Sequence, residues 1–293
     1  MLNMSGITEP KEGVMSEPVG MTTDYASSTG DPEPYLRAIA EAGFGSIHWC
    51  HQWNTDFIYG EAETRQIARW LSEFGLALND LHGSAGKEKS WSSEVEYARR
   101  AGVELVRNRI DMARRLACDV VIMHYPAEPD EPAERQPYWD RFRKTMDELR
   151  PCAAESGVRI AIENGVFGTI EKMLSLYGPD YLGLCYDSGH GNCIPDGLDR
   201  LDGIKDRLIA LHLDDNDGTG DQHRLIFSGT VDWQRLAGII AASGYDKPVM
   251  TMEVVTKNEG IDDEGEFLRR ALETGRRFAS MVEAERESPG PAS

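Results

Sequence analysis

Four side chains of the kinds that bind divalent metal ions follow four successive apolar segments of the chain. The segments cover residues 158–162, 182–186, 209–211 and 248–252, and the side chains at their ends are Glu163, Asp187, His212 and Glu253. Carboxylate oxygens and an imidazole nitrogen form a mixed ligand set that suits Mn²⁺, Co²⁺, Mg²⁺ or Zn²⁺. Without a cation, three carboxylates buried together would repel one another, and their pKa values would rise.

Each of these residues also has an ordinary explanation when it is taken alone. A Glu or Asp at the end of a strand is often a helix cap or a salt-bridge partner. Four ligands on four successive segments are harder to explain as caps. We therefore expect one divalent ion bound by all four side chains, with positions left open for a substrate.

All seven histidines lie at or shortly after the end of an apolar segment. His82 and His124 are either additional ligands or core histidines whose hydrogen bonds are satisfied. His190 is either a ligand or a group that orients one through a hydrogen bond. Asp221 and His223 either bind another cation or belong to a solvated loop.

Aromatic residues follow the apolar segments at residues 46–49 and 76–81. Trp49, Trp53 and Trp91 are candidates for a face against which a sugar ring packs, and His51 lies among them. Aromatic rings also close the mouths of barrels without binding a ligand. The sequence leaves both explanations open.

The elements that must position these residues alternate between strands and helices. We expect strands at residues 18–22, 46–49, 76–81, 119–123, 158–162, 182–186, 209–211 and 248–252, and helices at 31–42, 61–74, 93–117, 138–156, 169–177, 198–206, 231–242 and 264–283. Continuous apolar strands are typical of a parallel sheet that is covered on both faces. Eight such units close into a barrel whose strand ends share one rim, although the first strand is the weakest of the eight.

The sequence therefore predicts a single α/β domain, a (β/α)8 TIM barrel, over residues 15–284. A loosely packed N-terminus at residues 1–14 and a flexible tail at residues 285–293 would flank it. The 293 residues are about the length that one barrel needs.

Charge and cysteine usage limit the classes of partner. The net charge of −19 opposes binding to nucleic acid and to acidic membrane surfaces. Five cysteines without a C-x-x-C pair favour reduced thiols and a cytoplasmic setting. We see neither a secretory signal nor an apolar run near the roughly 20 residues of a membrane span. A homo-oligomer remains open.

Taken in order, several short motifs carry a resemblance to a known family. They are Ile162-Glu163-Asn164, Asp187-Ser-Gly-His190, His212-Leu-Asp-Asp-Asn-Asp-Gly218, Gly229-Thr-Val-Asp-Trp233 and Met252-Glu253. With them, nearly the whole chain resembles the xylose isomerase-like barrel superfamily. This superfamily includes sugar-phosphate isomerases and epimerases, ketose 3-epimerases and apurinic-site endonucleases.

The epimerase branch implies one divalent ion held by the four strand-end ligands. Glu163 and Glu253 would move a proton off and onto one carbon of a keto-sugar or an oxidised glycoside, through an ene-diolate. His190 would form a hydrogen bond with a substrate oxygen. The resemblance thus implies a metal-dependent sugar isomerase or epimerase.

The endonuclease branch implies additional ligands and up to three ions. His82 and His124 match its early histidines, and His190, Asp221 and His223 match a further ligand set. Metal-assisted hydrolase or lyase chemistry on a phosphodiester or glycosidic substrate is therefore the first alternative. A non-catalytic, metal-loaded sugar-binding protein is the second.

The chain departs from the ketose 3-epimerases at two places. Those enzymes carry an arginine shortly after the histidine that corresponds to His212, and this chain has Gly218 at about that position. Arg224 is a candidate to replace it as a substrate contact. The usual Gly-Glu-Gly before helix seven reads Phe227-Ser228-Gly229, so a local contact also differs.

Overall fold

Eight parallel strands form the centre of the molecule in a computed structural model that describes residues 18–288. The strands are β1 (Val19–Thr22), β2 (Ser46–Trp49), β3 (Ala77–His82), β4 (Val120–Met123), β5 (Arg159–Glu163), β6 (Leu182–Asp187), β7 (Leu208–His212) and β8 (Met250–Met252). Their order in the sheet is β7-β6-β5-β4-β3-β2-β1-β8. The expected first strand is present and pairs with both β2 and β8.

The sheet closes between β7 and β8 just beyond the end of the β7 ladder. The Leu213 N–H donates to the Thr251 carbonyl at 2.9 Å, and the Glu253 N–H donates to the Leu213 carbonyl at 3.0 Å. These bonds form an isolated parallel bridge between Leu213 and Met252. The result is a nearly closed barrel, which confirms the predicted (β/α)8 fold.

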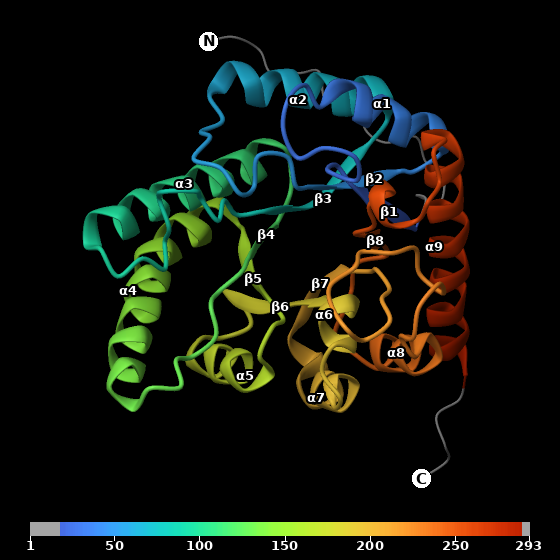
Figure 1. Ribbon diagram of the computed structural model, residues 1–293. Helices are drawn as coiled ribbons and strands as arrows, with labels where there is room; N and C mark the ends of the chain where they lie inside the picture. The colour runs from blue at the N-terminus through green and yellow to red at the C-terminus, as the bar shows by residue number, and fades with distance from the viewer. Residues whose placement is uncertain (1–17, 289–293) are drawn as a thin grey trace.

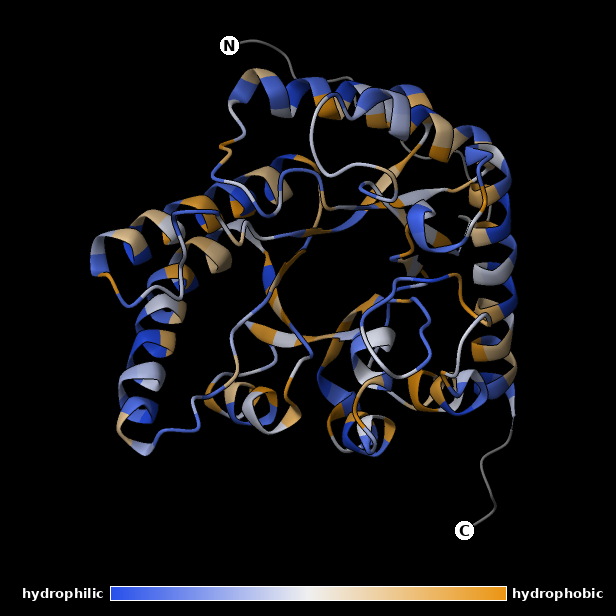
Figure 2. Ribbon diagram, viewed as in Figure 1, coloured by the Kyte–Doolittle hydropathy of each residue, from blue (hydrophilic) through white to orange (hydrophobic). Residues whose placement is uncertain are grey.

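Helices surround the barrel and alternate with its strands (Figure 1). They are α1 (Glu33–Ala42), α2 (Glu61–Phe74), α3 (Glu96–Arg115), α4 (Pro132–Ser156), α5 (Phe167–Leu176), α6 (Ser188–Asn192), α7 (Gly197–Ile204), α8 (Trp233–Ala241) and α9 (Glu264–Glu287), with short 3₁₀ turns at Lys205–Arg207 and Thr256–Asn258. Polar and apolar residues alternate around these helices, as expected where one face covers a sheet (Figure 2).

Two helix boundaries differ from the sequence prediction by four residues or more. The prediction started α4 at residue 138, after Pro137, but the helix begins at Pro132. Proline is accepted at the first helical position, and Pro137 removes only one hydrogen bond from an exposed turn. The last helix, α9, runs to Glu287, four residues beyond its expected end. The predicted loose segment at residues 1–14 and the tail from residue 289 onward lie outside the described residues.

The strands separate two apolar clusters by the alternation of their side chains. One small cluster contains Val120, Ile122, Ala161, Cys185, Ile209 and Ala210, and a much larger one joins the strands to the helices. Side chains two residues apart on a strand point to the same face. Glu163, Asp187 and His212 each follow a member of the small cluster by two positions, so they share its face. None of the helices within residues 18–288 is long and apolar enough to cross a membrane.

A candidate metal centre at the barrel mouth

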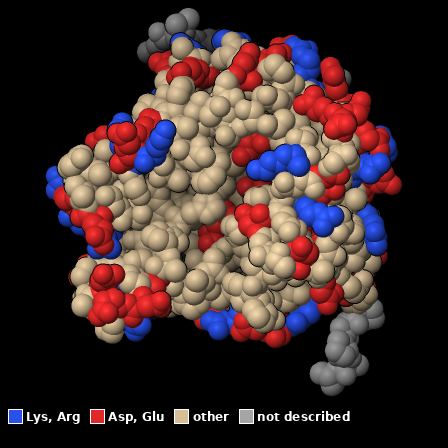
Figure 3. Space-filling view, in the orientation of Figure 1, with Lys and Arg blue, Asp and Glu red and all other residues tan. Residues whose placement is uncertain are grey.

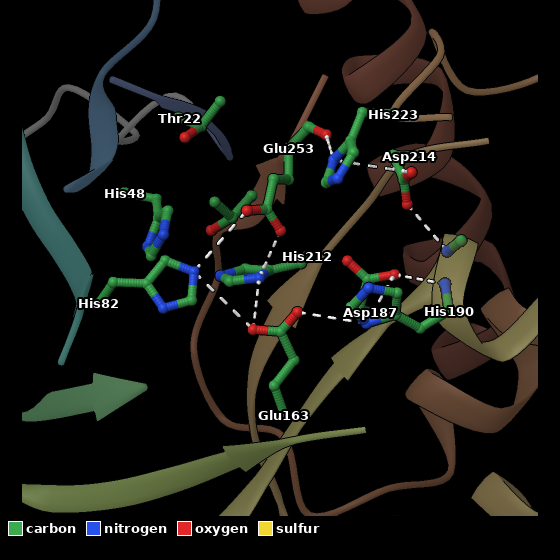
Figure 4. Close-up of polar contacts among 12 residues, drawn as sticks. Thr22, His48, His82, Glu163, Asp187, His190, His212, Asp214, His223 and Glu253 are labelled. Carbon is green, nitrogen blue, oxygen red and sulfur yellow. Dashed lines mark hydrogen bonds and ion pairs between the residues drawn. The ribbon is translucent and has the colours of Figure 1, made fainter. Parts of the chain in front are cut away.

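The four predicted ligands meet at one point inside the rim. Glu163, Asp187, His212 and Glu253 are all buried, and their donor atoms lie within 4.8 Å of one another. Figure 4 shows the Glu163 and Glu253 carboxylates on either side of the His212 ring. His212 Nδ1 lies 2.5 Å from Glu253 Oε2 and 3.3 Å from Glu163 Oε2. The structure thus brings together side chains from β5, β6, β7 and the end of β8.

The residues fit a metal ion because several of their buried polar atoms lack a hydrogen-bond partner. Among the described residues, these atoms include Glu163 Oε2, Asp187 Oδ2, Glu253 Oε2 and both ring nitrogens of His212. Buried polar atoms are normally satisfied, and leaving one unpaired costs about 1–3 kcal/mol. A cation coordinated by oxygen and nitrogen would satisfy this set in one step.

The acid–base properties of the centre show a conflict between its charges. Burial raises the pKa of Asp187 to about 7, against the pull of the nearby His190 ring. Burial alone would also raise the pKa of Glu163 and Glu253, but neighbouring imidazoles lower both: His124 and His212 act on Glu163, and His212 acts on Glu253. Two ionised carboxylates therefore lie beside a third that resists ionisation. A divalent cation would remove the conflict.

Asp187 combines the two explanations that the sequence offered for it. Its Oδ1 accepts a hydrogen bond from the His190 N–H at 2.6 Å and so caps the short helix α6. Its Oδ2 has no hydrogen-bond partner. The Asn164 side chain ties the ends of β5 and β6 together, since it donates to the Asp187 carbonyl at 2.9 Å and accepts from the Asp187 N–H at 2.5 Å. The cap fixes one oxygen and leaves the other for a ligand role.

A second group of ligands shares Glu163 with the first. The donor atoms of His82, His124 and Glu163 also lie within 4.8 Å of one another. His124 Nε2 is 3.4 Å from Glu163 Oε2, and His82 Nε2 is 3.8 Å from it. Burial lowers the pKa of His82 to about 4, which keeps its ring neutral and able to bind a metal. Trp53 stacks on His82 with ring centroids 5.2 Å apart.

A third group gathers at the outer side of the mouth. His190 Nδ1 donates to the Asn164 carbonyl at 3.0 Å, and His223 Nδ1 donates to the Glu253 carbonyl at 2.9 Å. Carbonyl oxygens only accept, so these bonds leave the Nε2 atoms facing Asp221 Oδ2, at 3.4 Å from His190 and 2.9 Å from His223. This is how second-shell groups orient metal-binding histidines.

The charges of the third group are strongly coupled to its neighbours. The Asp187 carboxylate raises the pKa of His190 to about 11 despite its burial. Burial would lower the pKa of His223, but the hydrogen bond to Asp221 and nearby carboxylates raise it to about 11. Without a metal, both rings therefore remain protonated and hold Asp221 as an ion pair.

Sequence reasoning missed Asp214, whose Oδ2 lies 3.9 Å from His223 Nδ1 beside the third group. Asp214 is fully buried, and its Oδ1 accepts from the Gly189 N–H at 2.8 Å while its Oδ2 lacks a partner. A Cβ at position 189 would lie 2.5 Å from both Asp214 oxygens, so any larger residue there would displace the Asp214 side chain. The sequence did offer a signal for Asp214. It is the second residue after His212, and side chains two residues apart on a strand point to the same face.

Several predicted substrate residues do not reach this centre. Trp49 is buried against the helices and donates to the Tyr59 hydroxyl at 3.1 Å. His51 is held between the Gly30 carbonyl and the same hydroxyl. Trp91 is buried beside Tyr125, with ring centroids 4.8 Å apart. Burial leaves the substrate role of these three residues without structural support.

Trp53 is the predicted aromatic contact that lines a cavity next to the centre. This cavity measures about 430 Å³, and its walls include Trp53, His223, Glu253 and Lys257. A second cavity of about 400 Å³ opens beside His124, Glu163, His190 and Asp221. Arg224 points to Glu259 instead, with Nε 3.8 Å from Oε1.

The chain is thus a (β/α)8 barrel with carboxylates and imidazoles gathered at the carboxyl ends of its strands, where barrel enzymes carry their active sites. A family model described as "Xylose isomerase-like TIM barrel" matches residues 36–271. The chain belongs to this family.

Two curated relatives show the breadth of the family. The chain is 30% identical over 281 residues to the uncharacterized protein y4fM of Sinorhizobium fredii, which covers 86% of this chain and 90% of that protein. It is 29% identical over 148 residues to the probable endonuclease 4 of Mycobacterium tuberculosis, with 45% of this chain and 55% of that protein covered. The second match therefore spans about half of the endonuclease.

Solved structures share the fold at low sequence identity. A D-tagatose 3-epimerase-like protein has a TM-score of 0.74 at 19% identity, over 92% of this chain and 98% of that one. An L-ribulose 3-epimerase has a TM-score of 0.70 at 17% identity, over 94% and 100%. The IOLI protein, solved with a zinc atom, has a TM-score of 0.70 at 13% identity, over 92% and 100%.

Proposed function

We propose that this protein is a divalent-metal-dependent sugar isomerase or epimerase that transfers a proton at the carbon next to a carbonyl group. The observation that carries the proposal is the pair of buried carboxylates, Glu163 and Glu253, that face each other across His212 at 3.3 and 2.5 Å. The solved relatives named as sugar 3-epimerases support a keto-sugar or an oxidised glycoside as substrate.

The four strand-end ligands would hold the ion. In each glutamate one carboxylate oxygen faces His212 and the other faces a different histidine. Glu163 Oε2 faces His212, while its Oε1 faces His190 Nδ1 at 3.4 Å. Glu253 Oε2 faces His212, while its Oε1 faces His82 at 3.8 Å. When bound, a divalent ion would polarise the substrate carbonyl and stabilise the charge that develops on its oxygen.

The chain itself supplies the groups that move the proton. Glu163 on β5 and Glu253 after β8 reach the centre from strands separated by β6 and β7. One carboxylate can take a proton from one face of the substrate carbon, and the other can deliver a proton to the opposite face. Their lowered pKa values keep them ionised before the reaction. We propose that His190, whose Nε2 faces Asp221 at 3.4 Å, gives up this contact to donate a hydrogen bond to a substrate oxygen.

The cavity beside Glu253 suits a small polar ring. Trp53 forms one wall, and Ser27, Ser28 and Asn54 offer groups that bind hydroxyls. Figure 3 shows acidic side chains in the hollow at the centre of this face, where a polyanion would be repelled. We therefore propose a small-molecule sugar as the partner, and the five free cysteines support a cytoplasmic setting.

The two additional ligand groups favour a second candidate, metal-assisted hydrolysis of a phosphodiester. His82 and His124 share Glu163 with the first group, and His190, Asp221 and His223 form another. Ions bridged by one carboxylate can act together on a phosphate ester. The match to the probable endonuclease 4 points the same way over about half of that protein.

Solvent-exchange experiments separate the two candidates. The metal-loaded protein is incubated in D₂O with a panel of free ketohexoses and 3-keto-glucosides, and deuterium in the sugars is followed by NMR and mass spectrometry. We expect deuterium at the carbon beside the carbonyl, and a loss of about 10²–10⁴-fold in rate for Glu163→Gln. The matched control is Glu155→Gln, which changes an exposed glutamate of α4.

Two further measurements complete the comparison. Elemental analysis counts the ions bound to each chain, and an oligonucleotide with an abasic site tests hydrolysis. Cleavage of that strand by protein carrying three ions, with no deuterium in any sugar, would overturn the isomerase proposal. Sugar binding without turnover, unchanged in Glu163→Gln, would instead indicate a binding protein.

A further inference from the structure

Two loops at the barrel mouth are joined by a carboxylate that belongs to none of the three ligand groups. The loop between β2 and α2 carries Asp56, and the loop between β3 and α3 carries a tight turn at residues 86–89. Asp56 Oδ1 accepts hydrogen bonds from the backbone N–H groups of Lys87 at 2.9 Å and Lys89 at 3.2 Å. The Glu88 N–H lies 3.3 Å from both carboxylate oxygens. Three successive N–H groups thus form a concave site for an anion, which Asp56 fills.

The turn depends on a glycine, and its three donors keep Asp56 ionised. Gly86 has a φ of +70°, and a Cβ there would lie 1.8 Å from the Lys89 carbonyl oxygen. A larger residue would open the turn and spread its N–H groups. Burial would raise the pKa of Asp56, but the hydrogen bonds from the turn lower it below its ordinary value.

The same two loops also meet at the backbone of Trp53. The Ala85 N–H donates to the Trp53 carbonyl at 2.7 Å. The hydroxyl of Ser84, a buried residue, donates to the Thr55 carbonyl at 2.7 Å. The β3–α3 loop therefore holds the middle of the β2–α2 loop through backbone bonds at Trp53 and Thr55 and through the carboxylate of Asp56.

Both ends of the β2–α2 loop are anchored elsewhere. At its start, the Gln52 N–H donates to the Ser28 carbonyl at 2.7 Å. At its end, the Asn108 side chain on α3 accepts from the Tyr59 N–H at 2.9 Å and donates to the Tyr59 carbonyl at 2.8 Å. The buried guanidinium of Arg109 lies over the Tyr59 ring, 4.4 Å from its centroid. Loss of Asp56 would therefore free the middle of the loop while its ends stay in place.

The middle of this loop presents the Trp53 ring to the metal centre. Its ring centroid lies 5.2 Å from that of His82 and 5.4 Å from that of His124, and the ring forms a wall of the cavity beside Glu253. Sites on loops are less precise than sites on strands unless supporting groups fix them. A wall that is already fixed lowers the cost of binding, because less of the loop has to be ordered when a ligand arrives.

We propose that Asp56 is a positioning residue that joins the two loops and thereby holds Trp53 as a fixed wall of the substrate cavity. Asp56 is not among the residues that line this cavity, so it acts through Trp53. The inference rests on the proposed function in taking the cavity as the sugar site. The position of the Trp53 ring can be measured without any sugar.

The first measurement is therefore nitrogen-15 NMR of the Zn²⁺-loaded protein, which follows the indole N–H signals of its six tryptophans. The Trp53 signal is the one that is absent from Trp53→Phe. In Asp56→Ala we expect this signal to shift and broaden, whereas the signal of Trp139 on α4 stays unchanged. Asp56→Asn keeps one oxygen as an acceptor and should keep the signal close to its wild-type position.

The second measurement uses initial rates with the sugar that exchanges deuterium. Asp56→Ala should raise the KM about three- to ten-fold with little change in kcat, as expected for the loss of the Trp53 wall. In the double variant Asp56→Ala/Trp53→Ala, the KM should not rise above that of Trp53→Ala alone, because Asp56 acts through this ring. Independent structural effects would instead multiply.

Asp232→Ala is the matched control variant. It removes another aspartate carboxylate that accepts from a backbone N–H group, that of Arg235 at 3.0 Å, at the start of α8. A general loss of stability would appear in this variant as a lower melting temperature. It should leave both the Trp53 signal and the KM unchanged.

Three outcomes would overturn the inference. They are an unchanged Trp53 signal in Asp56→Ala, a KM in the double variant that multiplies the two single effects, or equal changes in Asp232→Ala. The NMR result is independent of sugar chemistry. A protein that turns over no sugar, yet shows a displaced Trp53 signal in Asp56→Ala, would end the isomerase proposal and leave the positioning role standing.

Discussion

The carboxylate of Asp187 should make the stability of the metal-free protein depend on pH in a way that one substitution removes. Burial raises its pKa from 3.8 to about 7 in the folded protein. Between these values the folded state binds more protons than the unfolded state, so the free energy of unfolding falls as pH rises. The stabilisation that protonated Asp187 adds to the folded state is fully present below about pH 3.8 and is lost once the pH has passed 7.

The size of the effect follows from the shift. Three pKa units at about 1.4 kcal/mol each give roughly 4 kcal/mol, of which about 2.5 kcal/mol is lost between pH 5 and pH 8. The amide in the Asp187→Asn variant cannot ionise. This part of the dependence of the free energy of unfolding on pH should therefore disappear. At pH 8 the metal-free variant should therefore unfold at a higher urea concentration than the metal-free wild type, because a buried charge that His190 compensates only in part has been removed.

Urea unfolding followed by circular dichroism, on chelator-treated protein at pH 5 to 8, measures the difference between the two curves. Groups such as Glu163 and Glu253 titrate in both proteins, so the comparison reports on Asp187 together with His190, whose pKa the Asp187 carboxylate raises. Asp130→Asn, at an exposed loop position, is the control and should run parallel to the wild type. Loading with metal should reverse the order, because the variant lacks a ligand. Parallel curves for Asp187→Asn and wild type would refute the reasoning.

Three more predictions follow from the structure. Gly102→Ala should destabilise the protein by about 1–3 kcal/mol, because a Cβ there would overlap the backbone of Ser90 and Trp91, whereas Gly238→Ala, with open space around it, should stabilise by about 0.5–1 kcal/mol. Equal effects in urea unfolding would contradict this. Trp53→Ala should raise the KM for the sugar about three- to ten-fold, measured by initial rates, and a fall in kcat alone would argue against a wall of the substrate cavity. Metal at 100 times its Kd should raise the free energy of unfolding by about 2.7 kcal/mol, and an unchanged melting temperature would exclude a site in the folded protein.

Much of the barrel could be predicted because its strands are buried on both faces. Segments such as Val120–Met123 and Leu208–His212 are continuous apolar runs, and the polar residue that ends each run marks the rim. The ligands were recognisable because they are chemically unlike the strands that carry them. Strand order then follows from right-handed β–α–β connections.

Other features depend on tertiary structure that no local pattern reports. The Trp49 side chain faces the helices because its neighbour His48 faces the barrel interior, and the alternation of a four-residue strand is easily assigned the wrong way round. The buried His48–Asp80 contact, with 2.5 Å between Nδ1 and Oδ1, depends on the register shift between β2 and β3. Asp214 stands among the acidic residues of a loop that reads as solvated, and only its position two residues after His212 sets it apart.

The small side chains beneath the ligands give a reason for the buried His48–Asp80 pair. Ala161, Cys185 and Ala210 stand two positions before Glu163, Asp187 and His212, so β5, β6 and β7 contribute little volume at that depth. Protein interiors tolerate few voids, and the remaining space must be filled from the opposite strands. There β2 and β3 supply an imidazole and a carboxylate in place of aliphatic groups. Apolar side chains would fill the same volume at a lower desolvation cost.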